Sequence, residues 1–200
     1  MLMLIGRWWV SLGWPVAHLS AGLTRVSLAG TVLILLQLTI GATMRHQHAG
    51  LAISDFPLAH GQIWPDLSPA SITRYNALRV ETMAYEPITA FQVGLQMAHR
   101  GVAGLIFLVV ATGWWLTRHR VADLPPLRRL STGWLALLMG QIFLGAVTIW
   151  TNKSADMATA HVEVCALRVF TGSVLQGVAL RLVSRGAGAT APSGRGDAER

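Results

Sequence analysis

Two histidines lie inside long apolar stretches of this chain, where ionisable side chains are costly. His99 precedes Arg100 in LQMAHRGVAG (95–104), and His161 lies in TAHVEVCALRV (159–169). Ionisable residues at membrane depth usually mark a functional site. Two neutral imidazoles that face each other across a helical bundle are natural axial ligands of haem iron. The pair therefore predicts a metal site in which His99 and His161 bind the iron of a haem.

Other uses of these histidines stay open from the residues alone. A membrane histidine often only hydrogen-bonds a neighbouring helix. Zinc would need three or four ligands, and no third histidine, cysteine or carboxylate matches the depth of the pair. The single cysteine, Cys165, excludes an intrachain disulfide and a CxxC motif, and we expect it to be a packing residue.

The composition indicates an integral membrane protein. Of the 200 residues, 52% are hydrophobic and 12% are charged, whereas soluble domains average about 25% charged residues. The net charge of +7 comes from basic residues at the ends of apolar runs, so nucleic acid is not an expected partner. The fold class that follows is an all-α membrane protein, a four-transmembrane-helix bundle with a long extracytoplasmic loop. The predicted spans are about 26–44, 92–116, 131–150 and 156–183.

Basic residues also predict the orientation and the ends of the chain. Their excess before the first span, between the second and third, and after the fourth places both termini in the cytoplasm. We expect residues 1–20 to be an interfacial helix rather than a cleaved signal, and 184–200 to be a disordered tail beyond the bundle, 21–183. Apolar residues at helical spacing predict a surface helix over 72–85 in the outer loop.

A weak internal repeat relates the two halves of the bundle. QLTIGAT (37–43) and QIFLGAVT (141–148) each place Gly-Ala four residues after Gln, and each precedes a span with a histidine near its outer end. His99 is expected roughly 12 Å below the outer surface, and His161 at a similar depth. Gln92, Gln96 and His99 form one helical stripe that should face the bundle interior.

Three arginines accompany the histidines. Arg100 and Arg45 either pair with haem propionates or are interfacial arginines that reach the surface. Arg168 lies deeper, on the face of His161, and needs a partner such as a carbonyl, a Gln or a propionate. His46, His48 and His60 belong to the outer loop, and we expect surface roles for at least two of them.

These residues also carry a family resemblance. The motifs IGATMRHQHAGLAISDFPLAHGQIWP (40–65), QMAHR (96–100), QIFLGAVTIWTNKS (141–154) and TAHVEVCALRV resemble the haem A synthase family over roughly residues 30–180. That family has eight spans in two similar bundles, with paired haem-ligating histidines on the second and fourth helices of each. By matching positions, His99 and His161 would be axial ligands here.

The resemblance implies a function and its alternatives. The family oxidises the haem O methyl group to a formyl group to make haem A, so the expected cofactor is haem b, haem O or haem A, with haem O as substrate. Gln96 stands where the family's catalytic bundle has Glu, and Ser54 and Ala59 flank the D-F-P-L segment where many members carry cysteines. The catalytic residue is therefore unknown.

The alternatives are a haem b cytochrome or accessory half-bundle that transfers electrons, and a scaffold without haem. Expected partners are the lipid bilayer, a second bundle or a second copy of the chain, and a haem O synthase. The resemblance places the protein in a bacterial or archaeal plasma membrane.

Overall fold

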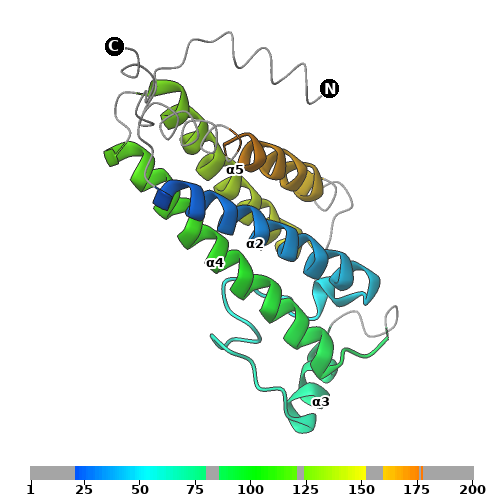
Figure 1. Cartoon of the computed structure of the whole chain (residues 1–200). Helices are drawn as coiled ribbons and strands as arrows, with labels where there is room; N and C mark the ends of the chain where they lie inside the picture. The colour runs from blue at the N-terminus through cyan, green and yellow to red at the C-terminus, as the bar shows by residue number, and fades with distance from the viewer. Residues whose placement is uncertain (1–20, 80–85, 121–123, 152–159, 176, 178–200) are drawn as a thin grey trace, which may run out of the picture.

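A bundle of antiparallel helices forms the body of the protein. The computed structural model describes residues 21–79, 86–120, 124–151, 160–175 and 177 (Figure 1). The expected interfacial segment 1–20 and the tail 184–200 lie outside these residues. The long helices are α2 (Ala21–His46), α4 (Ala90–Arg120), α5 (Pro125–Trp150) and a helix over 160–175.

Three of these helices are long and apolar enough to cross a membrane, namely α2, α4 and α5. The prediction of an all-α membrane bundle is confirmed. Each of the three extends beyond its predicted span, because the helix continues through polar residues at the ends of the apolar run. In α5 the helix begins at Pro125, whose fixed φ suits the first turn and whose missing N–H is not needed there. Of the fourth predicted span, 156–183, the structure describes the helix over 160–175.

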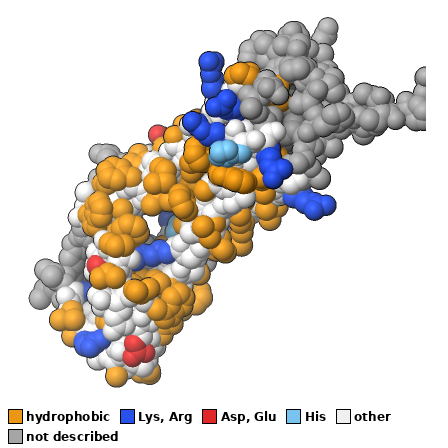
Figure 2. Space-filling model, turned by 90° about the vertical axis from the view of Figure 1, so that its left-hand side faces the viewer, with side chains coloured by type: hydrophobic (Ala, Val, Ile, Leu, Met, Phe, Trp, Pro, Cys, Tyr) orange, Lys and Arg blue, Asp and Glu red, His pale blue; other side chains and the backbone are white. Residues whose placement is uncertain are grey.

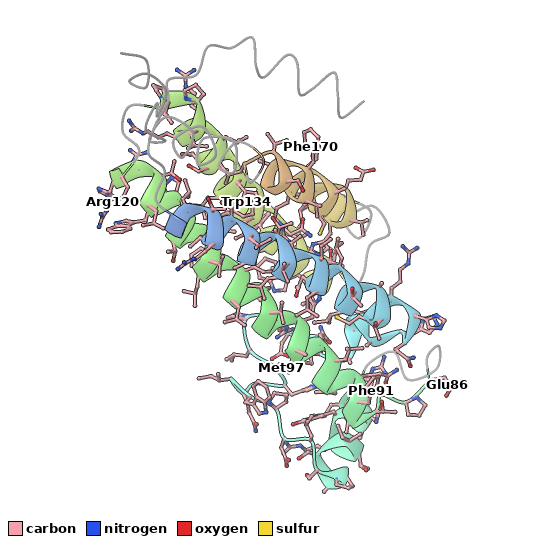
Figure 3. All side chains as sticks on the ribbon, viewed as in Figure 1. Glu86, Phe91, Met97, Arg120, Trp134 and Phe170 are labelled. Carbon is pink, nitrogen blue, oxygen red and sulfur yellow. The ribbon has the colours of Figure 1, made fainter. Side chains whose placement is uncertain are left out.

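The apolar surface of these helices is large. Leu28, Val32, Leu35, Phe107, Leu108, Phe143 and Phe170 are among the exposed hydrophobic residues. Figure 2 shows hydrophobic side chains covering most of one long face, with basic side chains gathered towards one end. Phe170 points away from the bundle (Figure 3). Such a surface is stable in contact with lipid tails and unfavourable in water.

Trp134 fills the centre of the bundle between two glycines. A methyl group on Gly30 of α2 would lie 2.7 Å from the Trp134 ring, and one on Gly172 would lie 2.9 Å from it. The indole N–H donates to the backbone oxygen of Arg168 at 3.1 Å. The large side chain of α5 thus requires small residues on two neighbouring helices, which is how membrane helices approach closely (Figure 3).

The buried faces of α2 and α5 follow one pattern. When Gln37 is aligned with Gln141, every buried position of α2 meets a buried position of α5, whereas the buried Ala146 of α5 meets the exposed Ala42. The pairs are Leu23 and Leu127, Ser27 and Ser131, Gly30 and Trp134, and Ile34 and Leu138. The internal repeat therefore extends well beyond the seven residues that the sequence motif shares.

The segment between α2 and α4 folds against one end of the bundle, which we call the loop end. It contains a short 3-10 helix, η1 (Ala49–Leu51), and α3 (Pro69–Leu78). A small second core joins this segment to the first turns of α4, through Ala52, Ile53, Ala59, Tyr75, Ile88, Val93 and Met97. Trp150 at the end of α5 donates to the backbone oxygen of Phe56 at 3.3 Å.

The predicted surface helix over 72–85 is wrong in its bounds. Helix α3 begins three residues earlier, because Ser68 accepts a hydrogen bond from the Ser71 N–H and Pro69 starts the first turn. It ends at Leu78, and Arg79 is extended. Asn76 exchanges two hydrogen bonds with the backbone of Ile88, at 2.8 and 2.9 Å, which ties the end of the helix to the approach to α4. Residues 80–85 lie outside the described structure.

Candidate functional site

His99 is held between α4 and α2. The side-chain amide of Gln37 donates to the backbone oxygen of His99 at 3.0 Å. One turn further along α2, a methyl group on Gly41 would lie 3.4 Å from Cε1 of the His99 ring. Gln37 therefore ties the two helices together, and Gly41 leaves the room that the imidazole occupies.

His161 is held in the same way between α5 and the helix over 160–175. Gln141 donates to the backbone oxygen of His161 at 2.9 Å. A methyl group on Gly145 would lie 3.3 Å from Cε1 of the His161 ring. The two histidines thus have equivalent surroundings, each provided by a Gln and a Gly four residues apart on the preceding long helix.

Both imidazoles retain bonding capacity that the described residues do not use. Nδ1 of His99 and Nδ1 of His161 are buried and have no hydrogen-bond partner. Buried nitrogens are normally paired, so such groups call for an explanation. A metal satisfies an imidazole nitrogen directly. The described residues contain no group of three or more His, Cys, Asp or Glu that could hold a metal ion, but a haem needs only two protein ligands. The pair fits a haem.

Arg168 lies deep in the bundle, beside this pair. Only 2% of its surface is exposed. Its Nη2 lies 3.8 Å from Sγ of Cys165, and its Nε has no partner. His161, Cys165 and Arg168 lie on one face of the helix over 160–175, since they are spaced four and three residues apart.

Gln96 binds the loop rather than standing free. Its Oε1 accepts from the Ile53 N–H at 2.7 Å, and its Nε2 donates to the Ile53 oxygen at 3.2 Å and the Gly50 oxygen at 3.4 Å. Gln92, one turn earlier, donates to the backbone oxygen of Gln47 at 2.7 Å. The polar stripe of α4 is therefore split, because Gln92 and Gln96 hold the loop while His99 reaches the bundle. A carboxylate at position 96 could accept from Ile53 but could donate to neither oxygen.

Arg100 is also engaged by the loop. Its two terminal nitrogens donate to the backbone oxygens of Leu58 and Asp55, each at 2.8 Å, and its guanidinium lies 5.5 Å from the centre of the Phe56 ring. Phe56 also contacts Trp150 edge to face. Arg100 thus closes the turn around the cis peptide bond Phe56–Pro57. Its expected contact with a haem propionate stays a prediction.

The remaining predicted residues lie at the loop end. Arg45, His46 and His48 are exposed, as expected for at least two of the loop histidines. His60 is half-buried, and its ring stacks on Tyr75 with centroids 3.8 Å apart. Its Nε2 must carry the proton, because it donates to the Ala52 oxygen at 3.1 Å. Burial lowers the pKa of His60 below its usual 6.5, and the hydrogen bond to Ala52 opposes that shift.

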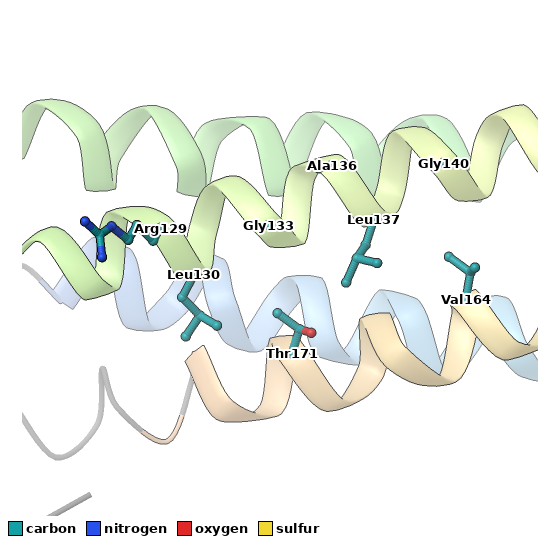
Figure 4. A pocket seen from close by; sticks show the side chains of 8 residues that line it. All are labelled: Arg129, Leu130, Gly133, Ala136, Leu137, Gly140, Val164 and Thr171. Atoms are coloured by element: carbon teal, nitrogen blue, oxygen red, sulfur yellow. The ribbon is translucent and has the colours of Figure 1, made fainter.

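A shallow groove runs between α5 and the helix over 160–175, on the outer surface of the bundle (Figure 4). Its volume is about 580 Å³, and its lining is largely apolar, with Gly133, Gly140, Val164 and Thr171 along its length and Arg129 at one end. None of the expected site residues lines it. The groove is therefore separate from the histidine pair.

The fold and the site together define a membrane helical bundle made of two similar helix pairs, each presenting one part-buried histidine. Residues 1–173 match the family model COX15-CtaA, described as cytochrome oxidase assembly protein, and the chain belongs to this family.

Two curated relatives share part of the chain. "Heme A synthase" of Parvibaculum lavamentivorans is 31% identical over 145 residues, which are 72% of this chain and 38% of the relative. "Heme A synthase" of Symbiobacterium thermophilum is 32% identical over 108 residues, which are 54% of this chain and 28% of the relative. The matches thus cover well under half the length of these relatives. No solved structure matches the chain.

Proposed function

We propose that this chain binds haem between His99 and His161 and takes part in haem A formation, the oxidation of the haem O methyl group to a formyl group. The observation that supports it best is the equivalence of the two histidines, each tied by a Gln and accommodated by a Gly. A structural histidine has no need of a second copy with the same surroundings. The relatives named "Heme A synthase" support the same proposal.

Each residue of the site has a stated part in this proposal. His99 and His161 would hold the iron, and Gln37 and Gln141 keep the backbone of each histidine at a constant position against the neighbouring helix. Bound haem would supply the iron redox chemistry, as cofactors do. Arg100 and Arg45 are proposed to meet haem propionates at the loop end.

An accessory role in electron transfer is the second candidate, and Gln96 favours it. All three polar contacts of this side chain are with the loop backbone, so the position where the family's catalytic bundle has Glu is used here to hold the loop. Under this reading the chain holds haem b and a second bundle carries the oxidation. That bundle would be a second copy of this chain or another protein, since the chain covers 38% and 28% of its relatives.

The proposal also includes the surroundings of the protein. We infer that both termini face the cytoplasm of a bacterial or archaeal cell, because basic residues gather at that end of the helices. A haem O synthase is the proposed source of substrate. Reporter fusions at each terminus test the orientation, and an active periplasmic reporter at either terminus would overturn it.

The first experiment is an absorption spectrum of detergent-purified protein, oxidised and reduced, with the extracted haem identified by chromatography. We expect six-coordinate haem in the wild type, its loss in His99→Ala and His161→Ala, and its retention in the control His46→Ala, which changes an exposed histidine. Haem O or haem A in the extract supports haem A formation, and haem b alone supports the accessory role. A colourless wild type, expressed with ample haem, would rule out both.

A second experiment separates the two candidates through Gln96. Substrate conversion is measured as haem A formed from haem O in membranes that contain the wild type or Gln96→Glu. If the chain is an accessory half, neither forms haem A without another bundle. Conversion by the wild type alone shows that Gln96 is compatible with catalysis. Conversion only by Gln96→Glu shows that the carboxylate is required.

A further inference from the structure

Arg168 breaks the symmetry of the two helix pairs. When His99 is aligned with His161, Arg168 falls at the position of Ile106, and both side chains are buried. The first pair thus has an apolar side chain at a place where the second has a guanidinium. Packing alone does not require a cation there, since Ile106 fills the equivalent position.

The charge of Arg168 lacks a counter-charge among the described residues. No carboxylate of the described chain lies within ion-pair distance, the contact with Sγ of Cys165 is weak at 3.8 Å, and Nε has no partner. A guanidinium has five N–H donors. A buried charge without an anion is strongly unfavourable, so it persists where a ligand or a function compensates it.

The side chain is directed towards the histidine pair. His161, Cys165 and Arg168 follow one another at helical spacing, so they share a face. Long side chains on a helix lean towards its N-terminus, and the contact of Arg168 with Cys165 has this direction.

We propose that Arg168 places a fixed positive charge beside the paired histidines and thereby raises the reduction potential of the haem that they hold. This inference rests on the proposed haem binding. Ferric haem gains one electron on reduction, and its net charge becomes more negative by one. A neighbouring cation in a medium of low dielectric constant stabilises the reduced form more than the oxidised form. Arg168 would exert this effect on the reduction potential through its charge alone, without a change in the two histidine ligands.

The test is a redox titration of haem-loaded protein, with dithionite as reductant and mediators present, followed by absorption. Arg168→Ile installs the residue of the equivalent position. We expect the ratio of ferrous to ferric haem at a given potential to fall about tenfold or more, which corresponds to about 59 mV for one electron. Arg168→Lys keeps the charge and should stay close to the wild type. Arg129→Ile removes an exposed arginine and should leave the ratio unchanged.

A second measurement uses the haem-free protein. Without haem, the charge of Arg168 is uncompensated, so Arg168→Ile and Arg168→Met should unfold at a higher temperature than the wild type. Both variants should also gain less stability than the wild type when they bind haem. A lower unfolding temperature for both would show that the chain itself compensates the charge, and would overturn the proposal.

The outcomes separate this proposal from haem binding itself. If the wild type binds no haem, both the proposed haem binding and the proposed role of Arg168 are ruled out. A wild type with six-coordinate haem, together with an unchanged ferrous to ferric ratio in Arg168→Ile, ends only the role of Arg168. If Arg168→Ile does not load haem, Arg168→Met, which keeps a long apolar side chain, is titrated in its place.

Discussion

Gln141 reaches across from α5 and donates a hydrogen bond of 2.9 Å to the backbone oxygen of His161. Gln37 has the same relationship to His99, at 3.0 Å. In both glutamines the other amide atom, Oε1, is buried without a partner. Each glutamine therefore contributes one favourable hydrogen bond and one buried acceptor that is unpaired and unfavourable. Because these two contributions to stability offset each other, we infer that the glutamines mainly position the histidines.

Replacement of Gln141 by Leu should test this balance. Loss of the hydrogen bond is offset by loss of the unpaired acceptor, so we expect the free energy of unfolding of the haem-free protein to change by no more than about 1 kcal/mol. Haem content should nevertheless fall several-fold, because His161 loses its tie to α5. Thermal unfolding and the ratio of haem to protein measure the two effects. Thr39→Val, which changes an exposed side chain bonded only within α2, is the control.

The space beside each histidine gives a second prediction. Gly145→Ala adds a methyl group 3.3 Å from His161, closer than most carbon contacts, and should displace the ring by a few tenths of an ångström. We expect a several-fold loss of six-coordinate haem in the absorption spectrum. Gly140→Ala, on the same helix, meets no atom within 4 Å and should retain full haem content, with up to about 1 kcal/mol of added helix stability. Equal spectra for the two variants would contradict this account.

Arg100 gives a third prediction, which sets its two suggested roles apart. Arg100→Met removes two hydrogen bonds from a charged donor to loop oxygens, worth about 1.5–3 kcal/mol each at most. Protease cleavage within 52–68 should become at least tenfold faster. Arg100→Lys should be intermediate, since one ammonium group cannot reproduce the fork of the guanidinium. Unchanged cleavage together with weaker haem binding would instead assign Arg100 to a propionate.

His60 gives a prediction for pH. Its pKa is lowered in the folded protein by burial, so the unfolded chain binds the proton first as pH falls. Its contribution to stability is therefore complete above the unfolded value of 6.5 and is lost as pH decreases through the lowered pKa. The loop should become more sensitive to protease in acid below about pH 6.5. Asn tolerates the positive φ of 51° at this position. His60→Asn should therefore make the loop more sensitive to protease at all pH values, and this sensitivity should no longer increase in acid.

The histidine pair was open to prediction because helical period and span direction depend on local sequence. Two apolar runs in the same direction, with a histidine near the start of each, predict one depth for both side chains. The Gln–Gly motif gave the repeat for the same reason. The start of α3 was also readable, since Ser68 and Pro69 are a common helix beginning, but the apolar spacing alone pointed to a later start.

The roles of Gln96 and Arg100 could not be predicted in this way. Both side chains bind backbone oxygens of a loop, and those oxygens are positioned by the path of the chain rather than by residue type. The position of Trp134 between Gly30 and Gly172 is similar, because it depends on how three helices pack. The asymmetry at Arg168 and Ile106 needs the alignment of both halves, and the Gln–Gly motif of α2 and α5 does not reach it.

The two Gln–His ties differ greatly in the length of chain between their partners. Gln37 and His99 are 62 residues apart, whereas Gln141 and His161 are only 20 apart. Closing the longer loop costs about 0.7–1 kcal/mol more in chain entropy. The pair formed by α5 and the helix over 160–175 is synthesised last, yet it can form first, because its pairing costs less chain entropy. It would then offer a folded surface, with Trp134 in place, on which α2 and α4 come together.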